Sequence, residues 1–465
     1  MRTRTSLAPL LALLAMACDE GGSLAYYNVE ILDTGGDFPV DDGMITVTVK
    51  HAGETLECND GPCTADIRDG EFMGLELPLA SWEGMTEIRA DIWDEPDRWI
   101  GATPPFQPWG EGVDAAAALR VVVGRPETCA ELTLDGYVTG DPAALAPPRA
   151  RAAAVERRNV VLIAGGEEID GAADDHVTKL DQLLFDTVPF DPWTDRTEIG
   201  AARGLALSED VSLVVGDRAQ FLYELGQAST DPIDLHDGVG FASAVVSLPT
   251  GGAVIGGRAT RGISWINAQG AADTSRQLAV DRTAPVAARL GDGILVVGGH
   301  AAGAASAEWL PLSGSGEPRD LDLPVASGGV LFPSPDGAAA LWIGYVEGGV
   351  TSSTTALIRC DDGDCTAEPG PVTWDRARAD FASVVTAGGT LWLLGGEIDG
   401  ELTTHVDLVR WQGGAPRIEA GPDLPVENAG AVAFEHTAGV VTLAGGRYRD
   451  MAGRFVMCFP SALDL

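Results

Sequence analysis

Short apolar runs that end in a glycine pair, or in a close variant of one, recur along the C-terminal part of the chain. The runs end at Gly166, Asp217, Gly257, Gly299, Tyr345, Gly396 and Gly446. Apolar runs of this length, bounded by glycine, are typical of buried β-strands. The first and last ends lie 280 residues apart, which gives a period of about 47 residues and predicts one four-stranded unit per repeat.

Two of the repeats share a longer phrase. "AGGEEIDGAADDHV" ends at Val177, and "LGGEIDGELTTHV" ends at Val406. We interpret the phrase as the same edge of two repeats, in which Gly-Gly serves close packing and Asp-Gly serves a turn, so that nothing in it needs to be a functional site. Its histidines, His176 and His405, lack a third ligand at fixed spacing. We therefore expect each to cap a loop, with metal binding as the alternative.

Other signals recur in phase with the glycine pairs. "FASAVV" begins at Phe241 and "FASVVT" at Phe381, which is three periods later, and both are predicted to be first strands of a repeat. An aromatic residue follows in the predicted third strand of several repeats, at Tyr223, Trp265, Trp309 and Trp411. Proline-rich segments such as "AGPDLPVE" then lead into the next repeat.

This order of signals resembles that of kelch-type, galactose-oxidase-like β-propellers over about residues 129–465. The resemblance implies seven four-stranded blades, glycine pairs that let neighbouring blades pack closely, and aromatic residues that fill the gap between blades. The predicted fold class is all-β. A seven-bladed kelch-like β-propeller over residues 126–465 is preceded by a small β-sandwich domain.

Residues 18–125 comprise an N-terminus at Cys18 and the predicted β-sandwich domain. Apolar and polar residues alternate in segments such as "MITVTVKHAG", "MTEIRADIWD" and "ALRVVVG", and turn residues separate these segments. The region is similar to the immunoglobulin-like or carboxypeptidase-regulatory-like modules of bacterial surface lipoproteins.

The first twenty residues, "MRTRTSLAPLLALLAMACDE", have two arginines, a short apolar stretch and then small residues. This is the layout of a secretory signal peptide, predicted over residues 1–17. "LLAMAC" resembles the lipobox of bacterial lipoproteins, which implies lipidation of Cys18 and a membrane anchor in the cell envelope. We expect the outer membrane or cell surface, with the periplasmic face as the alternative. An ordinary signal peptide that leaves Cys18 unmodified is the competing interpretation.

Six cysteines remain after Cys18, an even number that suits disulfides in an exported protein. "CNDGPC" and "CDDGDC" each place four turn-forming residues between two cysteines, which is a hairpin spacing. We predict the pairs Cys58–Cys63, Cys360–Cys365 and Cys129–Cys458. Metal ligation by these cysteines is the alternative, but the spacing is not that of a zinc site. Asp361, Asp362 and Asp364 could bind calcium, and we favour a solvated acidic turn.

The last pair follows from how a circular fold must close. The final repeat supplies three strands, "AGAVAFEH", "VVTLAGG" and "RFVMCFPS", and its fourth is missing. An unpaired edge would remain unless an earlier segment completes it. "TCAELTLDG" from Thr128 stands just before the first repeat, so we expect it to supply the missing strand. Cys129 and Cys458 would then be cross-strand neighbours.

Composition limits the classes of partner. The 465 residues are 45% apolar and include 59 glycines, which suits a large protein of short strands and tight turns. The formal net charge of -39 argues against binding to nucleic acid or to an anionic membrane surface. Any contact with a membrane is therefore expected through the lipid on Cys18.

The sequence carries no HExxH, GxSxG, P-loop or Rossmann motif. Galactose-oxidase-like copper chemistry needs tyrosine and histidine ligands and a free cysteine, yet only six tyrosines exist and the cysteines are predicted to be paired. "SPDGAAALW", residues 334–342, resembles the Asp-box of sialidases, and we interpret it as a turn before a strand. We expect no cofactor and no catalytic or metal-binding residue.

The leading hypothesis is a monomeric, non-catalytic, lipid-anchored platform that binds a protein or glycan partner. The alternative is a propeller enzyme, a hydrolase, lyase or oxidase, with its site at the central tunnel. A cluster of three or more His, Asp, Glu or Arg side chains at the tunnel mouth would favour the enzyme.

Overall fold

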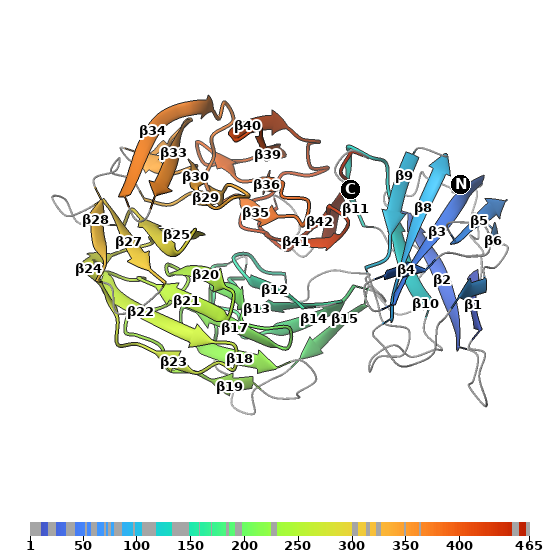
Figure 1. Cartoon of the computed structure of the whole chain (residues 1–465), viewed down its shortest axis with the longest axis horizontal. Coiled ribbons are helices and arrows are strands. Elements are labelled where there is room, and N and C mark those ends of the chain that lie inside the picture. Colours follow the sequence, from blue (N-terminus) through green and yellow to red (C-terminus); the bar gives the residue numbers. More distant parts are fainter. Residues whose placement is uncertain are drawn as a thin grey trace.

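The structure is a computed structural model. It describes residues 11–16, 25–33, 42–51, 54–56, 63–68, 71–72, 76–78, 86–95, 98–104, 118–132, 148–157, 159–168, 170–182, 186–190, 198–224, 230–299, 306–312, 317–321, 327–347, 350–361, 364–448 and 455–461. Over these residues the protein is all-β, with many antiparallel sheets and no helix (Figure 1). Cys18, Cys58 and Asp362 lie outside the described residues, and so do the predictions made for them.

The N-terminal region forms one ten-stranded sheet in the order β6-β5-β3-β8-β9-β10-β2-β1-β7, with β4 paired to β3. We call it the N-terminal sheet. Its strands are β1 (Leu11–Met16), β2 (Ala25–Asp33), β3 (Asp42–His51), β4 (Glu54–Leu56), β5 (Cys63–Arg68), β6 (Glu71–Phe72), β7 (Glu76–Pro78), β8 (Thr86–Glu95), β9 (Arg98–Ala102) and β10 (Ala118–Val123).

The predicted sandwich stays a prediction, because hydrogen-bond pairing alone does not say whether the N-terminal sheet folds into two layers. The described strands lie on one hydrogen-bonded path, because β9 and β10 pair through Gly101 with Val123 and Ala102 with Val122. This short link joins a half built around β3 and β8 to a half built around β2 and β10. Alternation along single strands predicts strands, but it does not specify whether their edges meet.

Seven further sheets of four or five strands are found in the described part of the chain. Sheet 1 contains β12 (Ala153–Arg157), β13 (Val160–Ala164), β14 (Val177–Asp181) and β15 (Asp186–Phe190). Sheet 2 contains β16 (Ala202–Ala206), β17 (Val211–Gly216), β18 (Gln220–Glu224) and β19 (Thr230–Pro232). Sheet 3 contains β20 (Ala244–Leu248), β21 (Gly251–Ile255), β22 (Thr260–Asn267) and β23 (Ala272–Asp273), with β24 (Gln277–Arg282) also paired to β22.

The remaining sheets follow the same order of strands. Sheet 4 contains β25 (Val286–Leu290), β26 (Gly293–Val297), β27 (Ala307–Pro311) and β28 (Arg319–Leu321). Sheet 5 contains β29 (Val330–Pro333), β30 (Ala339–Ile343), β33 (Thr354–Asp361) and β34 (Asp364–Thr373). Sheet 6 contains β35 (Ala382–Val385), β36 (Leu391–Leu394), β39 (Val406–Gln412) and β40 (Ala415–Ala420). Two small hairpins are β31 (Val346–Glu347) with β32 (Val350–Thr351) and β37 (Glu397–Ile398) with β38 (Glu401–Leu402).

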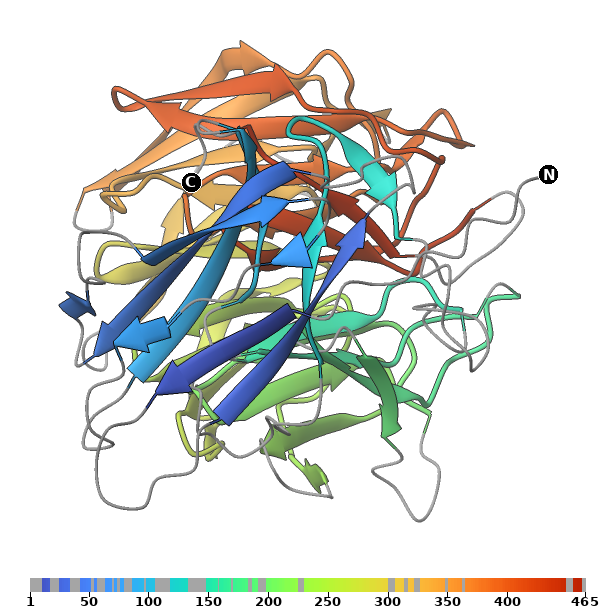
Figure 2. The same ribbon diagram turned by 90° about the vertical axis from the view of Figure 1, so that its right-hand side faces the viewer.

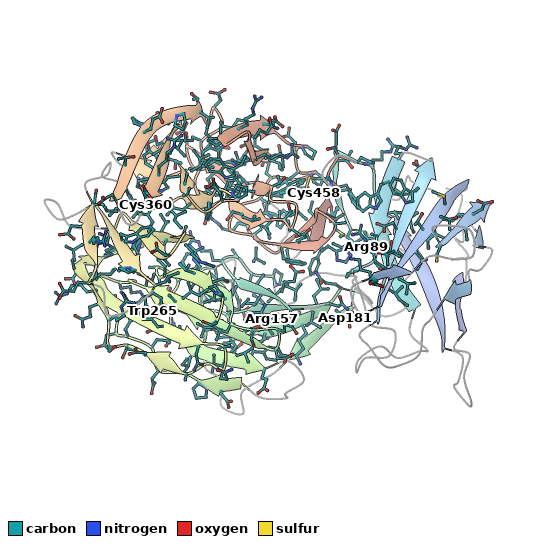
Figure 3. All side chains as sticks on the ribbon, viewed as in Figure 1. Arg89, Arg157, Asp181, Trp265, Cys360 and Cys458 are labelled. Carbon is teal, nitrogen blue, oxygen red and sulfur yellow. A yellow bond between two sulfur atoms is a disulfide. The ribbon has the colours of Figure 1, made fainter. Side chains whose placement is uncertain are left out.

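Sheet 7 is completed by a strand from far earlier in the chain. It contains β41 (Val432–Thr437), β42 (Val440–Ala444) and β43 (Phe455–Cys458), and its fourth strand is β11 (Cys129–Glu131), which pairs antiparallel to β43. Cys129 lies opposite Cys458 and is bonded to it by a disulfide, and Cys360 is bonded to Cys365, as predicted (Figure 3). Cys63 is also disulfide-bonded, to a residue outside the described part of the chain.

Most consecutive sheets contact one another through their first strands, for example β12 with β16 and β20 with β25, whereas sheets 5 and 6 contact through β34 and β40. Sheet 7 also contacts sheet 1, through β41 and β12. Backbone hydrogen bonds support this last contact, from Gly446 N to Arg149 O at 2.8 Å and from Arg151 N to Gly430 O at 2.6 Å. In Figure 1 the seven sheets succeed one another around a common centre.

The glycine pairs lie where neighbouring segments approach closely. In sheet 6, Gly395 and Gly396 have φ values of 58° and 112°, in the left-handed region that favours glycine. A Cβ added to Gly395 would lie 2.3 Å from the carbonyl oxygen of Asn428, just before sheet 7, and one on Gly396 would lie 2.6 Å from Ala379 O. Close packing between sheets therefore requires glycine here.

Gly395→Ala is predicted to lower the free energy of unfolding by about 2–4 kcal/mol, because left-handed strain of about 1–2 kcal/mol adds to a clash with backbone. Gly400→Ala is the matched control: Gly400 has φ 82°, but a Cβ there would meet nothing within 4 Å. Gly400→Ala should therefore lower the free energy of unfolding only by the left-handed strain of about 1–2 kcal/mol. Urea denaturation of both variants measures the difference, and equal losses would show that sheet packing does not depend on Gly395.

The N-terminal sheet shares a hydrophobic core with sheets 1 and 7. Trp99 and Val122 from the N-terminal sheet belong to the same buried cluster as Phe434, Phe455 and Phe459. Figure 2 shows the N-terminal sheet lying across these strands. A segment predicted as a separate domain is thus packed against the end of the chain.

A buried arginine stands four residues before the first strand in sheets 1, 4 and 6. These residues are Arg149, Arg282 and Arg378, and none is more than 1% exposed. Each guanidinium donates to backbone carbonyls in or next to the second strand of the sheet that follows it in the chain: Arg282 Nη1 donates to Gly298 O at 2.7 Å, and Arg378 Nη2 donates to Leu393 O at 2.8 Å. The sequence analysis had assigned these arginines no role.

Candidate functional site

Five charged side chains from sheets 1, 6 and 7 form a network of ion pairs, which we call the charged cluster. Arg151 Nη1 lies 3.1 Å from Glu167 Oε2, and Arg151 Nη2 lies 3.4 Å from Asp380 Oδ2. Arg447 also pairs with Asp380, and its Nη2 lies 2.8 Å from Glu397 Oε1. The cluster therefore connects the last two sheets to the first.

Backbone geometry brings these side chains together. Arg151 and Asp380 each stand two residues before a first strand, with φ values of 55° and 52°. Glu167 and Glu397 follow glycine pairs and bridge to the residues just before Arg151 and Asp380. Both glutamates belong to the phrase that occurs twice in the sequence. The sequence interpretation gave these glutamates no role, and the structure shows both in ion pairs.

The cluster contains more charged side chains than the three named in the criterion for an enzyme, but that criterion also requires a position at the mouth of a tunnel, which these contacts do not show. The chemistry of the cluster is also limited, because every member is ion-paired with another and an arginine guanidinium stays protonated in proteins. Burial lowers the pKa of Arg151, but the charge and hydrogen bond of Asp380, followed by those of Glu167, outweigh burial and raise it. The arrangement can orient a ligand or hold sheets together.

Arg203 extends the positive charge near this cluster. It lies in β16, its guanidinium carbon is 4.6 Å from the centre of the Phe241 ring, and its Nε donates to Phe241 O at 3.3 Å. Desolvation lowers the pKa of Arg203, while the charge of Asp380 raises it in part. Protein atoms surround the Arg203 side chain and cause the desolvation, but part of the side chain is exposed to solvent.

Glu156, in the first strand of sheet 1, is the described carboxylate with the most altered protonation. Burial and then the negative charge of Glu435 raise its pKa to about 8, against an opposing effect of Arg157. The side chain is also exposed to solvent, and solvent screening reduces what the shift contributes to stability. A carboxyl group that titrates near neutral pH is a feature of general acids and bases.

The Glu156 shift predicts a pH dependence of stability. The folded protein holds this proton more tightly than the unfolded chain, whose glutamate has a pKa of 4.5, so stability should fall as the pH rises from about 4.5 through 8. Glu156→Gln should therefore raise the melting temperature more at pH 9 than at pH 5. Glu317→Gln, at an exposed loop position, is the control. An identical shift at both pH values would contradict the assignment.

The two histidines of the repeated phrase both adjoin carboxylates. His176 Nδ1 lies 3.0 Å from Asp174 Oδ1 and 3.1 Å from Asp175 Oδ1, so these three residues could offer ligand atoms to a metal. The guanidinium of Arg149, however, lies 3.9 Å from the same Asp174 oxygen and opposes a second cation there. His405 Nδ1 instead lies 3.3 Å from Asp423 Oδ1.

The Asp-box-like phrase forms a turn between β29 and β30, as predicted. Asp336 Oδ1 accepts hydrogen bonds from the Ser334 hydroxyl at 2.5 Å and from Ala338 N at 3.1 Å. These bonds lower the pKa of Asp336. Trp342 is fully buried and donates to Gly328 O, so it packs the core. The acidic turn between Cys360 and Cys365 is a hairpin in which Asp361 lies opposite Asp364.

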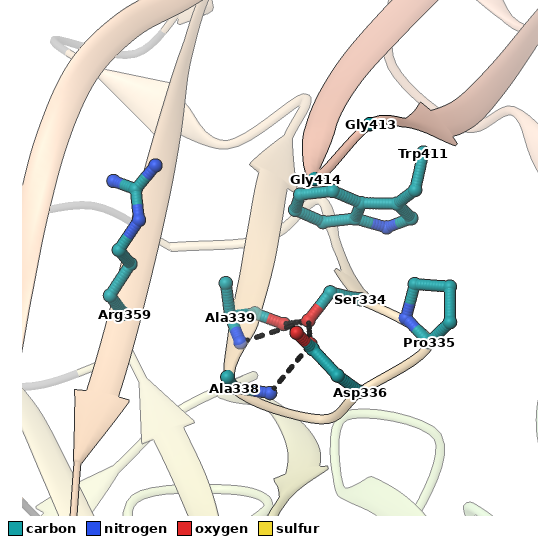
Figure 4. A pocket seen from close by; sticks show the side chains of 9 residues that line it. All are labelled: Ser334, Pro335, Asp336, Ala338, Ala339, Arg359, Trp411, Gly413 and Gly414. Atoms are coloured by element: carbon teal, nitrogen blue, oxygen red, sulfur yellow. Dashed lines mark hydrogen bonds between the residues drawn. The ribbon is translucent and has the colours of Figure 1, made fainter.

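A cleft of about 410 Å³ lies between sheets 5 and 6 (Figure 4). It is lined by Ser334, Pro335, Asp336, Ala338, Ala339, Arg359, Trp411, Gly413 and Gly414. The sequence analysis expected the third-strand aromatic residues to fill gaps between neighbouring units. Trp411 does approach Phe332 of sheet 5, with ring centres 6.2 Å apart, but its ring also forms a wall of this cleft.

Comparisons with protein-family models and with curated proteins find no match to the chain. The disulfides indicate an oxidising, extracytoplasmic location. In the described part of the chain, no helix has the length and apolar character needed to cross a membrane.

Proposed function

We propose that this protein is an exported, lipid-anchored binding platform at the bacterial cell envelope, without catalytic activity, that binds a protein or glycan partner. The observation that carries the proposal is the cleft between sheets 5 and 6. It combines an aromatic ring with hydrogen-bonding groups, and its lining contains no histidine, cysteine or buried carboxylate that could act as a base or nucleophile.

We further propose that sheets 1 to 7 are the blades of a kelch-like β-propeller. The order of strands within each sheet, the contacts between successive first strands and the strand donated to sheet 7 all support this proposal. The glycine pairs support the kelch type, because they occupy positions where a Cβ would strike a neighbouring segment.

Lipidation of Cys18 supplies the proposed anchor. The mature protein would then begin at Cys18 and would lack β1, which pairs with β2 and β7. Metabolic labelling with a fatty-acid analogue tests this step, with Cys18→Ala as the control. A mature protein that takes up no label, or that begins elsewhere, would refute the anchor.

The binding role itself is tested by cross-linking in the native cell, followed by identification of captured partners. A platform should capture a reproducible partner from the envelope, and the same partner should bind the purified protein. Capture that changes at random between replicates, with no binding in vitro, would contradict the role.

The alternative is a propeller enzyme, a hydrolase, lyase or oxidase, with its site at the central tunnel. The number of clustered charges and the raised pKa of Glu156 are the observations that favour it. Incubation with envelope glycans and peptides, followed by mass spectrometry, separates the two functions. Turnover of a substrate that is lost in both Glu156→Gln and Asp380→Asn would show that the protein is an enzyme and would refute the proposed non-catalytic function.

A further inference from the structure

From the lining of the cleft between sheets 5 and 6, we infer that it is a binding site for a neutral oligosaccharide. This inference rests on the proposed binding function and names the class of ligand. A volume of about 410 Å³ falls within the range of small-ligand pockets.

The aromatic wall of the cleft provides the first half of the argument. The Trp411 ring is half-buried, and its Nε1 is buried with no hydrogen-bond acceptor among the described residues. Beside it, Gly413 and Gly414 form a turn above which a Cβ would meet nothing within 4 Å. A flat ring next to a side-chain-free turn offers an open apolar surface, which suits the apolar face of a sugar ring.

Polar groups supply the second half. Figure 4 shows the Trp411 ring above the turn that carries Ser334 and Asp336, with Arg359 to one side. Asp336 uses Oδ1 within the turn, and Arg359 Nη1 pairs with Glu368 Oε2 at 3.1 Å. A carboxylate acceptor below the aromatic ring and a guanidinium donor to one side of it match the hydroxyl groups of a saccharide.

Charge and rigidity narrow the class of ligand. The formal net charge of -39 disfavours an anionic glycan, which makes a neutral one the better fit. Arg359 immediately precedes Cys360, whose disulfide to Cys365 ties β33 to β34. The guanidinium therefore projects from a cross-linked hairpin, and this limits the freedom lost when a ligand binds.

The test uses the purified mature protein and three neutral trisaccharides: cellotriose, maltotriose and chitotriose. Saturation-transfer NMR should detect binding of at least one, and calorimetric titration should give its affinity. Trp411→Ala should weaken that affinity by at least about tenfold, as expected for a central aromatic contact, whereas Trp411→Phe should retain most of it. Trp265→Ala removes a third-strand tryptophan of sheet 3 that lies outside the cleft, and it should leave the affinity for the trisaccharide unchanged.

Trp411 also packs near Phe332, so a loss of affinity in Trp411→Ala could come from a loss of folding. A second variant separates these two causes. Asp336→Asn keeps an oxygen for the bonds within the turn but changes the acceptor, and it should weaken binding without moving the melting temperature. No binding of any trisaccharide, or binding unaffected by both variants, would overturn the saccharide site. If the chain still captures an envelope protein, the platform stands and only this inference fails. Cleavage of the sugar would instead refute the platform.

Discussion

Replacing both Cys129 and Cys458 by alanine is expected to lower the free energy of unfolding by an amount on the order of 5 kcal/mol. The two cysteines are 329 residues apart, so their bond restricts the unfolded chain far more than a short-range disulfide does. Without it, β11 would be held to β43 by three residue pairs and by packing alone. Equilibrium denaturation in urea measures the loss.

The matched control is the other described disulfide. Cys360 and Cys365 are only five residues apart, so the same loop-entropy argument predicts a loss of about 2 kcal/mol for their double alanine variant. Cys360 and Cys458 both pack against hydrophobic clusters, so both double variants also remove an apolar contact. Equal losses in the two double variants would show that closure of sheet 7 contributes nothing beyond a local cross-link.

Local signals explain why the strands of the C-terminal region could be predicted. Most second strands are runs of apolar residues buried on both faces, as in β26 and β36, and a glycine pair or a close variant of one marks the end of each. The donated strand was predicted by counting the strands of the last repeat, which supplies three of the four that a sheet needs. The segment that begins at Thr128 stands just before the first repeat and could supply the fourth. In the N-terminal region, alternation predicted the strands but not their pairing, and the described strands lie on one hydrogen-bonded path.

The candidate sites depend on contacts that no local pattern contains. Arg151 and Asp380 are 229 residues apart in sequence, and their meeting requires sheets 1 and 6 to lie on either side of sheet 7. The position of Trp411 in a third strand was predictable, but the cleft beside it also needs the turn at Ser334 from the previous sheet. The one available signal for the charged cluster was the glutamate that follows the glycine pair in both copies of the repeated phrase.

Arg282→Met is expected to lower the free energy of unfolding by about 3–5 kcal/mol, because it leaves a buried carboxylate without its partner. Arg282 and Glu308 are both fully buried, and Arg282 Nε lies 2.8 Å from Glu308 Oε1. Burial lowers the pKa of Arg282, and the charge of Glu308 offsets this in part. This is expected for a buried charge that its ion-pair partner stabilises. The other Glu308 oxygen accepts a backbone hydrogen bond from Ala279 N at 2.6 Å.

The double variant Arg282→Met, Glu308→Met decides whether the loss comes from the unpaired charge. It should be more stable than Arg282→Met alone, since two apolar side chains of similar length leave no buried ion. Recovery should be incomplete, because Gly298 O and Ser306 O also accept hydrogen bonds from Arg282 and would lose a donor. Arg261→Met, which breaks an exposed pair with Asp281 in the same sheet, should change stability by no more than about 1 kcal/mol. A double variant as unstable as Arg282→Met would show instead that the backbone carbonyls, and not Glu308, make the arginine necessary.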